Sequence, residues 1–266
     1  MSKRVGGLDR DQISRAEILG DPISPLSSGA QLTDQSATLR VASYQMDFEW
    51  TRSVREMLSE KSELFEFSPV LVASGRGVAV KRNDKFRRSL RLSSKHFPEL
   101  ARQVESLLRN RKKEIVELLN LPASPWHHFQ IQGLAYGDGD YFELHRDTSP
   151  FMERERLVTF VCFVHREPAA FQGGDLELVG GKGASLRLTP RVGQLVLFPS
   201  RTLHRVHPVQ LLGDSFIDRR LVLSGFISRE RGWQERLFRF CRSTAVSLRR
   251  RALRVLRKMS VRVPSS

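Results

Sequence analysis

The sequence is poor in cysteine and in long apolar runs. Cys162 and Cys241 are its only cysteines, and they form neither a CxxC motif nor a disulfide framework. No stretch approaches the ~18 consecutive apolar residues expected of a membrane-spanning helix. The first residues, MSKRVGGLDRDQISRAEILGD, lack the apolar segment of a secretory signal. We therefore expect a cytoplasmic protein that does not depend on an oxidising compartment.

Acidic residues are scarce relative to basic ones. The chain has 44 lysines and arginines against 29 aspartates and glutamates, which gives a formal net charge of +15. Residues 229–266 hold twelve basic and two acidic side chains, and they account for ten of these fifteen charges. The basic surplus is therefore mainly a property of this C-terminal tail.

The tail, residues 229–266, has the pattern of an amphipathic helix. Arginines occupy many of the positions between apolar residues at steps of three and four, namely Leu237, Cys241, Ala245, Leu248, Ala252, Val255 and Met259. Such a helix suits packing on the rest of the protein, a homodimer contact, an anionic membrane or nucleic acid. A tail that is disordered when alone is the remaining interpretation, and the pattern leaves these alternatives open.

Residues 1–128 divide by composition. Residues 1–38 are polar, rich in Ser, Gly and Asp and without periodicity, which predicts a flexible leader. Residues 39–128 read as an N-terminal support of the main domain, with a helix near Phe48–Leu58 and short strands in FSPVLVAS and FRRSLRLS. One amphipathic helix is predicted over FPELARQVESLLRNRKKEIVELLN, residues 97–120, packed on a sheet.

Residues 129–228 change to a succession of short strand-like runs. These are FQIQGLAY, YFELH, LVTFVCFVH, DLELV, SLRLT, QLVLFP, LHRVHPV and RLVLSGFI, separated by turns such as GDG, QGG and GGKG. About eight short strands at this spacing predict a sandwich, barrel or jelly roll. The fold class is therefore mainly β, with flanking helices.

Within this region the stretch DYFELHRDTSPF places His145 and Asp147 two residues apart in a predicted strand. Residues at this spacing share a face, and a metal ion is one partner for such a pair. His204, in FPSRTLHRVHPV, completes a set of two histidines and one carboxylate, which is the ligand set of non-haem Fe(II) oxygenases. His207 is the rival third ligand, but its odd spacing from His204 points it to the opposite face.

A dicarboxylate co-substrate would need a cationic partner beside such a metal. In IDRRLVLSGFIS one of Arg219 and Arg220 is expected to face inward, because the planar guanidinium group matches a carboxylate.

The order of these motifs, YGDGDYFELHRDT, RLVTFVCFVH, FQGGDLELV, TPRVGQLVLFPSRTLHRVHPV and RRLVLSGFIS, resembles the 2-oxoglutarate/Fe(II)-dependent dioxygenases of the prolyl 4-hydroxylase-like branch. The similarity covers about residues 80–228 and implies a double-stranded β-helix (jelly roll). It implies His145, Asp147 and His204 as iron ligands and, by its spacing to Phe226, Arg220 as the 2-oxoglutarate clamp. Tyr136 matches a tyrosine near the co-substrate.

The chain departs from its relatives at one position of the co-substrate site. Several of them place a tyrosine where this sequence has Phe163, so more of the anchoring falls to Arg220 and to Thr159. The retained Asp147 argues against the halogenase variants of the family. The glycines of FQGG match a family turn, and a tight turn explains them without a catalytic role.

The resemblance implies hydroxylation with Fe(II), 2-oxoglutarate and O2, and with ascorbate as reductant. The expected substrate is of amino-acid type: a prolyl residue in a peptide or protein, or a free or carrier-bound small metabolite. One alternative is a metal-retaining jelly-roll binding protein that acts through its basic tail on nucleic acid or an anionic membrane. A zinc hydrolase is a weaker third interpretation, because the same residues can hold Zn(II) but no general base stands at a defined spacing.

Overall fold

The computed structural model describes residues 23–24, 39–74, 77–148, 154–181, 184–230 and 232. Three α-helices lie in its N-terminal half: α1 (Phe48–Glu60), α2 (Pro98–Asn110) and α3 (Lys112–Leu118). Short 3₁₀ turns cover Ser62–Leu64, Ser94–His96 and Phe216–Asp218. The strands are β1 (Ile23–Ser24), β2 (Ala42–Met46), β3 (Glu66–Phe67), β4 (Val70–Ser74), β5 (Gly77–Lys81), β6 (Arg87–Arg88), β7 (Leu90–Ser93), β8 (His128–Tyr136), β9 (Tyr141–His145), β10 (Arg154–Phe163), β11 (Phe171–Gly173), β12 (Leu176–Val179), β13 (Ser185–Leu188), β14 (Gln194–Pro199), β15 (Leu203–Val206), β16 (Val209–Leu211) and β17 (Arg220–Glu230).

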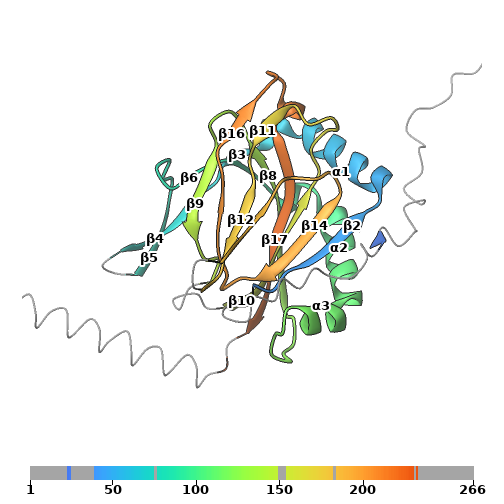
Figure 1. Cartoon of the computed structure of the whole chain (residues 1–266), viewed down its shortest axis with the longest axis vertical. Helices are drawn as coiled ribbons and strands as arrows, with labels where there is room; N and C mark the ends of the chain where they lie inside the picture. The colour runs from blue at the N-terminus through green and yellow to red at the C-terminus, as the bar shows by residue number, and fades with distance from the viewer. Residues whose placement is uncertain are drawn as a thin grey trace, which may run out of the picture.

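Two antiparallel sheets form the body. The larger has eight strands in the order β1-β2-β14-β10-β17-β8-β7-β3, and the smaller has five in the order β13-β12-β15-β9-β6. Neighbouring strands in each sheet are mostly distant in sequence, as in a jelly roll (Figure 1). The predicted fold class, mainly β with flanking helices around a jelly-roll core, is confirmed.

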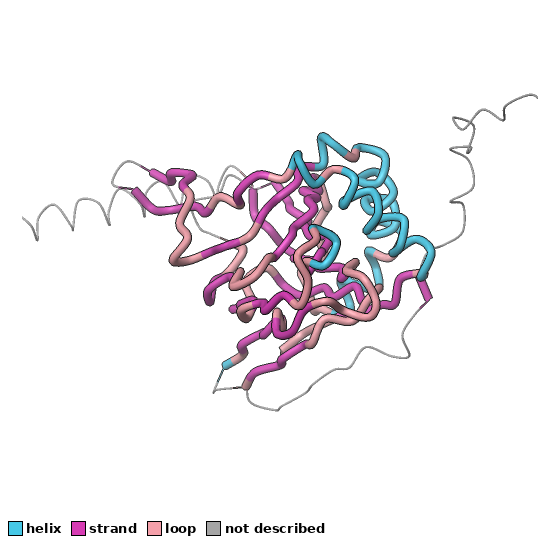
Figure 2. The backbone as a smooth tube through the Cα atoms, turned by 90° about the horizontal axis from the view of Figure 1, so that it is seen from above, coloured by secondary structure: helices cyan, strands magenta, loops and turns pink. Residues whose placement is uncertain are grey.

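The helices cover one side of the sheets (Figure 2). Their buried residues, including Leu58, Leu108 and Ile115, join one apolar cluster with residues of the large sheet. Asp47 caps α1 by accepting a hydrogen bond from the Trp50 amide at 2.9 Å, and α2 begins at a proline, which suits the first turn. The predicted α1 is confirmed, with two further residues.

The single helix predicted over residues 97–120 is wrong in one respect. It is divided into α2 and α3 at Arg111, whose backbone (φ −99°, ψ 11°) leaves the helical region and whose N–H bonds to the Arg109 carbonyl. The apolar positions of α2 and α3 still face the sheet, so the amphipathic pattern predicted the packing but not the break.

Strand β17 shows how one strand serves two sides of the large sheet. Leu221, Leu223 and Ile227 belong to the cluster shared with the helices. The alternate residues Arg220, Val222, Ser224 and Phe226 line a cavity on the other side. This follows from the period of two along a strand, and it leaves β17 buried on both faces from residue 220 to residue 228.

The N-terminal support contributes strands as well as helices. β2, which the sequence analysis did not predict, pairs with β14 from residues 42 to 45, and β7 pairs with β8. The β4–β5 hairpin projects from the body at the end away from the helices (Figure 1). Of the predicted leader, only β1 belongs to the described residues, where it pairs with β2.

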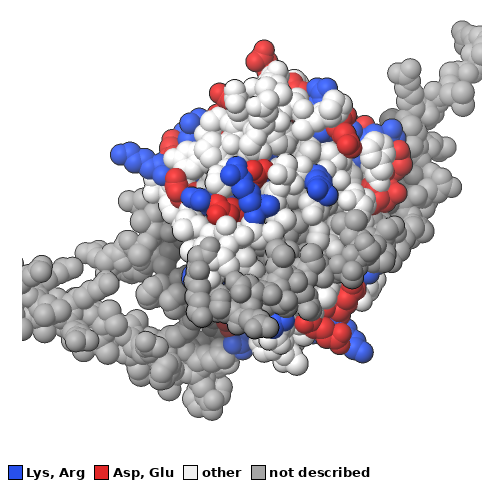
Figure 3. Space-filling model, in the orientation of Figure 1, with Lys and Arg blue, Asp and Glu red and all other residues white. Residues whose placement is uncertain are grey.

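Basic and acidic side chains alternate on the face shown in Figure 3, without a single-sign patch among the residues coloured there. The tail beyond Glu230 lies outside the described residues, apart from Gly232, so its helix stays a prediction. Among the described helices, none is long and apolar enough to cross a bilayer.

Candidate metal centre and its cavity

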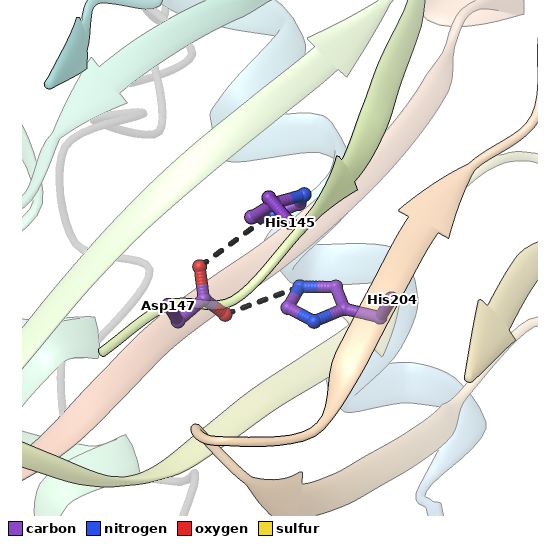
Figure 4. A group of neighbouring side chains, drawn as sticks. All are labelled: His145, Asp147 and His204. Carbon is purple, nitrogen blue, oxygen red and sulfur yellow. Dashed lines mark ion pairs between the residues drawn. The ribbon is translucent and has the colours of Figure 1, made fainter. Parts of the chain in front are cut away.

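His145, Asp147 and His204 meet between the two sheets (Figure 4). Their ligand atoms all lie within 4.8 Å of one another, and among the described residues they form the one such group of three or more. Asp147 Oδ1 lies 3.4 Å from His145 Nε2, and Asp147 Oδ2 lies 3.2 Å from His204 Nε2. The carboxylate therefore faces both imidazoles.

The pairing of β9 with β15 brings the two histidines together. His145 and His204 are direct cross-strand partners, and a register irregularity separates them from the next pair, Phe142 and Val206. Because the bulge breaks the alternation, Phe142 stacks on His145 with ring centroids 3.5 Å apart. Asp147 lies two residues beyond the end of β9, where its amide donates to the Ser200 carbonyl at 3.0 Å.

Each histidine has a fixed tautomer. Nδ1 of His145 donates to the Glu143 carbonyl at 2.6 Å, and Nδ1 of His204 donates to the Thr202 carbonyl at 3.0 Å. A carbonyl oxygen can only accept, so Nδ1 carries a proton and, in the neutral imidazole, the Nε2 lone pair faces the centre. His145 Nε2 is buried with no hydrogen-bond partner. This donor set fits a divalent transition metal.

The three groups shift one another's proton affinities. Burial opposes ionisation of Asp147, but the charge that His204 carries when protonated and the close approach of both imidazoles outweigh it and hold the pKa of Asp147 well below its usual range. Burial lowers the pKa of His145. Burial also disfavours charged His204, but the charge and hydrogen bond of Asp147 raise the pKa of His204. Asp147 is thus an ionised carboxylate that can bind a metal ion.

Thr159 lies beside Asp147 rather than beside Arg220. Its hydroxyl donates to Asp147 Oδ2 at 2.8 Å and lies 2.9 Å from the Ser200 hydroxyl. The expectation that Thr159 helps to anchor a distal carboxylate is therefore not matched by its contacts, because β10 carries it to the metal end of the sheet opposite Phe226. Its contacts assign it to orienting Asp147.

One cavity of about 700 Å³ contains the triad and Arg220. Arg220 is fully buried, and none of its three guanidinium nitrogens has a hydrogen-bond partner. Burial lowers its pKa to about 10. A buried cation without a partner is costly, so this side chain is arranged for an anion that enters from outside.

Two aromatic rings and a glycine surround Arg220. Its guanidinium carbon lies 4.9 Å from the Tyr136 ring centre and 5.1 Å from that of Phe163. Gly174, at φ +67°, leaves the space that Arg220 occupies, because a Cβ there would lie 2.6 Å from Arg220 Cδ. The FQGG turn therefore has a structural role in this site that the sequence analysis did not assign.

The two rival residues lie elsewhere. Arg219 lies over the Phe216 ring, 5.4 Å from its centre, and does not line the cavity. His207, one residue beyond the end of β15, donates from Nε2 to Glu177 at 2.8 Å and does not line the cavity. The inward position of Arg220 and the outward position of His207 follow from strand alternation, as the sequence predicted.

Sequence reasoning missed several residues that support the site. Ser200, Gly174 and Arg156 each contact a site residue: Ser200 and Arg156 contact Thr159 and Asp147, and Gly174 contacts Arg220. Their types gave no signal of their own, because serine, glycine and arginine are common in turns and strand ends. Only their contacts in the folded structure distinguish them.

Comparison with known proteins shows what this chain is similar to. Residues 131–228 match the family model of the 2OG-Fe(II) oxygenase superfamily. An uncharacterised PKHD-type hydroxylase of Synechocystis is 26% identical over 156 residues, which are 55% of this chain and 52% of that protein. A PKHD-type hydroxylase of Parvibaculum lavamentivorans is 44% identical over 80 residues, 29% of this chain and 32% of that protein. The chain spans about half or less of the length of these relatives.

Solved structures give the same fold. A prolyl-4-hydroxylase of Pseudomonas putida superposes with a TM-score of 0.51 and 18% identity, over 72% of this chain and 94% of that one. A prolyl hydroxylase of Trichoplax adhaerens, solved with a hypoxia inducible factor peptide fragment, has a TM-score of 0.50 and 16% identity, over 71% of this chain and 80% of that one.

Proposed function

Because residues 131–228 of this chain carry the 2OG-Fe(II) oxygenase fold and motifs, we propose that the protein is a 2-oxoglutarate- and Fe(II)-dependent dioxygenase that hydroxylates its substrate. The observation that carries the proposal is one cavity with two complementary groups. It holds two imidazole Nε2 atoms and an ionised carboxylate that face one another, and also a buried guanidinium without a hydrogen-bond partner.

In this proposal His145, Asp147 and His204 hold the iron, and their arrangement leaves ligand positions open for the co-substrate and O2. Iron with O2 and 2-oxoglutarate supplies the oxidising chemistry when bound. Thr159 fixes the Asp147 carboxylate, and the Glu143 and Thr202 carbonyls fix both imidazoles. Arg220 binds the far carboxylate of 2-oxoglutarate, between Tyr136 and Phe163.

The sheets and the apolar lining exclude water from the reacting centre. Val161, Leu176 and Val222 lie along the cavity between its two ends. Positioning and a dry cavity are the contributions that a protein makes to this kind of chemistry. Asp147 is the one carboxylate that lines the cavity, so a hydrolase would lack a second acidic group to serve as general base.

The proposed substrate is an amino-acid-type centre, either a prolyl residue in a peptide or protein or a free or carrier-bound metabolite. The names of the relatives support a hydroxylase, and two neighbours of the same fold are prolyl hydroxylases. They do not narrow the substrate of this chain further.

The test is succinate formation from 2-oxoglutarate by the purified full chain with Fe(II), ascorbate and O2, together with the absorption band of the anaerobic Fe(II)–2-oxoglutarate complex. We expect both signals in the native protein. His145→Ala should abolish both, because it removes one of three metal ligands.

His207→Ala is the matched control, since it removes a histidine three residues from His204 that points away from the cavity. It should keep both signals. Absence of the absorption band from the native protein, or its survival in His145→Ala, would refute the proposal.

A further inference from the structure

We propose that the substrate carries an anionic group, a carboxylate or a phosphate, and that the guanidinium groups of Arg87, Arg91 and Arg156 bind it. We call these three residues the arginine trio. The inference rests on the proposed function, because it names the class of substrate that the same cavity takes.

The cavity has an excess of positive charge that the co-substrate does not remove. Its lining includes one carboxylate, Asp147, and five arginines, Arg87, Arg91, Arg146, Arg156 and Arg220. The two positive charges of Fe(II) and the two negative charges of 2-oxoglutarate offset each other. After Arg220 has taken its carboxylate, the arginine trio still faces the space left for the substrate.

Strand pairing directs Arg91 into the cavity. It lies in β7 directly opposite Leu134 of β8, and Leu134 is one of the alternate β8 residues that line the cavity. Arg91 Nε is buried without a hydrogen-bond partner. Arg91 therefore shares with Arg220 the property that indicated an external anion.

The other two members are held in place by neutral groups. Arg87 lies opposite Phe142, 4.5 Å from its ring centre, and donates from Nε to the Ser89 hydroxyl at 3.0 Å. Arg156 lies 3.6 Å from the Phe226 ring centre. It donates to the Gln130 side chain at 2.9 Å and to the Asp147 carbonyl at 3.1 Å.

Arg87 lies close enough to Arg91 and to Arg156 for their like charges to repel. Burial lowers the pKa of Arg87, and repulsion by Arg91 adds to this effect against the attraction of Tyr136 and Asp147. Burial likewise lowers the pKa of Arg156, while attraction by Asp147 opposes this effect and repulsion by Arg87 adds to it. Like charges directed at one space are destabilising without an anion between them.

Arginines outside the cavity differ from the arginine trio in their partners. Many of them pair with a carboxylate, as in Arg88–Asp140 at 3.4 Å, Arg166–Asp218 at 2.6 Å and Arg205–Glu177 at 2.7 Å. No side-chain carboxylate lies within ion-pair distance of the trio in the described residues. The counter-charge is therefore expected from the ligand.

The other residues that line the cavity indicate that the ligand also has an apolar part. Phe86, Phe142 and Phe226 stand among the trio, and the cavity of about 700 Å³ is larger than a five-carbon dicarboxylate requires. An organic acid or an organic phosphate fits this combination better than a bare inorganic anion.

The test uses benzoate and benzamide, which share a shape and differ in charge. Each is titrated calorimetrically into the anaerobic full chain that is saturated with Fe(II) and 2-oxoglutarate. We expect benzoate to bind at least about tenfold more tightly than benzamide, because only the carboxylate pairs with buried guanidinium groups. Arg91→Gln should reduce this preference to within about threefold.

Arg88→Gln is the matched control. Arg88 neighbours Arg87 in β6 but faces outward to Asp140, so its loss should leave the tenfold preference unchanged. Arg91→Lys should retain part of the preference, since it keeps the charge but not the bidentate geometry.

Two further pairs of probes identify the source of the anion. Phenyl phosphate against benzoate distinguishes a phosphate from a carboxylate. N-acetyl-Asp-Pro-Asp-amide against its Asn counterpart distinguishes an acidic peptide from a free acid. These two pairs are compared once benzoate is preferred over benzamide, and discrimination that is lost in Arg91→Gln then assigns that anion to the arginine trio.

Equal or undetectable binding of benzoate and benzamide to the native protein would overturn the inference, and so would an unchanged preference in Arg91→Gln. Displacement of 2-oxoglutarate by benzoate would also overturn it, because the anion would then occupy Arg220. The absorption band is read in the same samples. Its absence marks failure of the proposed function, whereas an intact band without charge preference marks failure of this inference alone.

Discussion

The face of the eight-stranded sheet that meets the helices differs from the face that lines the cavity, although the same strands supply both. Towards the helices, residues such as Phe160, Leu221 and Leu223 are buried in a continuous apolar cluster. Towards the cavity, the alternate residues include Arg220, Ser224 and Thr159, which are equally buried but polar.

This difference separates stability from function within single strands. The helix face gains free energy from burial of apolar surface, and every methylene contributes. The cavity face gives up part of that gain, because Arg220 and Arg91 hold buried nitrogens without partners. Unsatisfied polar groups persist in a folded protein where a ligand satisfies them.

Breaking the helix face should produce the largest loss of stability. Phe160 is fully buried and packs over Gly225 of the neighbouring strand, where a Cβ would lie 2.6 Å from the Phe160 ring. Phe160→Ala should lower the free energy of unfolding by about 3–5 kcal/mol, because it leaves a cavity. Urea denaturation measures this loss.

Phe48→Ala is the control for this change, since Phe48 is 55% exposed at the start of α1. It should cost less than about 0.5 kcal/mol. The folded fraction of Phe160→Ala should keep the Fe(II)–2-oxoglutarate absorption band. Loss of the band at a temperature where the variant is folded would show that the two faces are not separable.

Breaking the cavity face at its charged end should have the opposite effect on stability. Arg220→Met removes a buried cation and keeps an unbranched apolar side chain, so the ligand-free variant should unfold at the same temperature or higher. Its 2-oxoglutarate requirement should rise by about a hundredfold or more, because a buried charge pair is lost. Arg219→Met, at the adjacent outward residue, should keep the native requirement. Native 2-oxoglutarate affinity in Arg220→Met would remove Arg220 from the clamp role.

A smaller effect is expected at Gly174, where backbone and cavity meet. Gly174→Ala places a Cβ at φ +67°, 2.6 Å from Arg220 Cδ and 3.0 Å from a Val209 methyl. We expect a loss of about 1–2 kcal/mol in stability and a weaker 2-oxoglutarate affinity. Gly139→Ala shares the positive φ (+65°) but meets only the end of Arg88, at 3.4 Å. It should lose stability alone, and equal affinity losses in both variants would contradict the role of Gly174.

The strands and the triad could be predicted from the sequence because they depend on local periodicity and on residue type. The pair of His145 and Asp147 is weak evidence alone, but His204 in a later strand completes a recognisable ligand set, and alternation correctly turned Arg220 inward and His207 outward. The two-residue spacing of His145 and Asp147 correctly predicted that their side chains lie together. A shared strand face is only part of the reason. Asp147 lies past the end of β9, and the Ser200 carbonyl holds it in place.

The rest depends on which strands become neighbours, which no local pattern records. Thr159 was expected near the far carboxylate, but the register of β10 with β17 places it opposite Phe226, at the metal end. Arg87 and Arg91 looked like ordinary arginines of a basic chain. Only the pairing of β6 with β9 and of β7 with β8 shows that they face the cavity.

The smallest predicted effect concerns the pH dependence of stability at His165, which interacts with Arg55 of α1 and with Arg220 of the cavity. It is buried at the end of β10, its carbonyl accepts from Arg55 of α1 at 3.5 Å, and its Nε2 has no partner. Burial chiefly, with repulsion from Arg220 and Arg55, lowers its pKa from 6.5 to about 4. As the pH falls below 6.5, the unfolded chain gains a proton here that the folded chain does not, so stability should fall, by about 1 kcal/mol at about pH 5.5.

The free energy of unfolding is measured by denaturation at about pH 7.5 and at about pH 5.5. Between these two pH values it should fall by about 1 kcal/mol less in His165→Gln than in the native protein. The matched variant at exposed His128, His128→Gln, should show the full native drop. An unchanged drop in His165→Gln would mean that this histidine is protonated in the folded protein, and that the repulsion from the cavity arginines does not reach the helix side of the sheet.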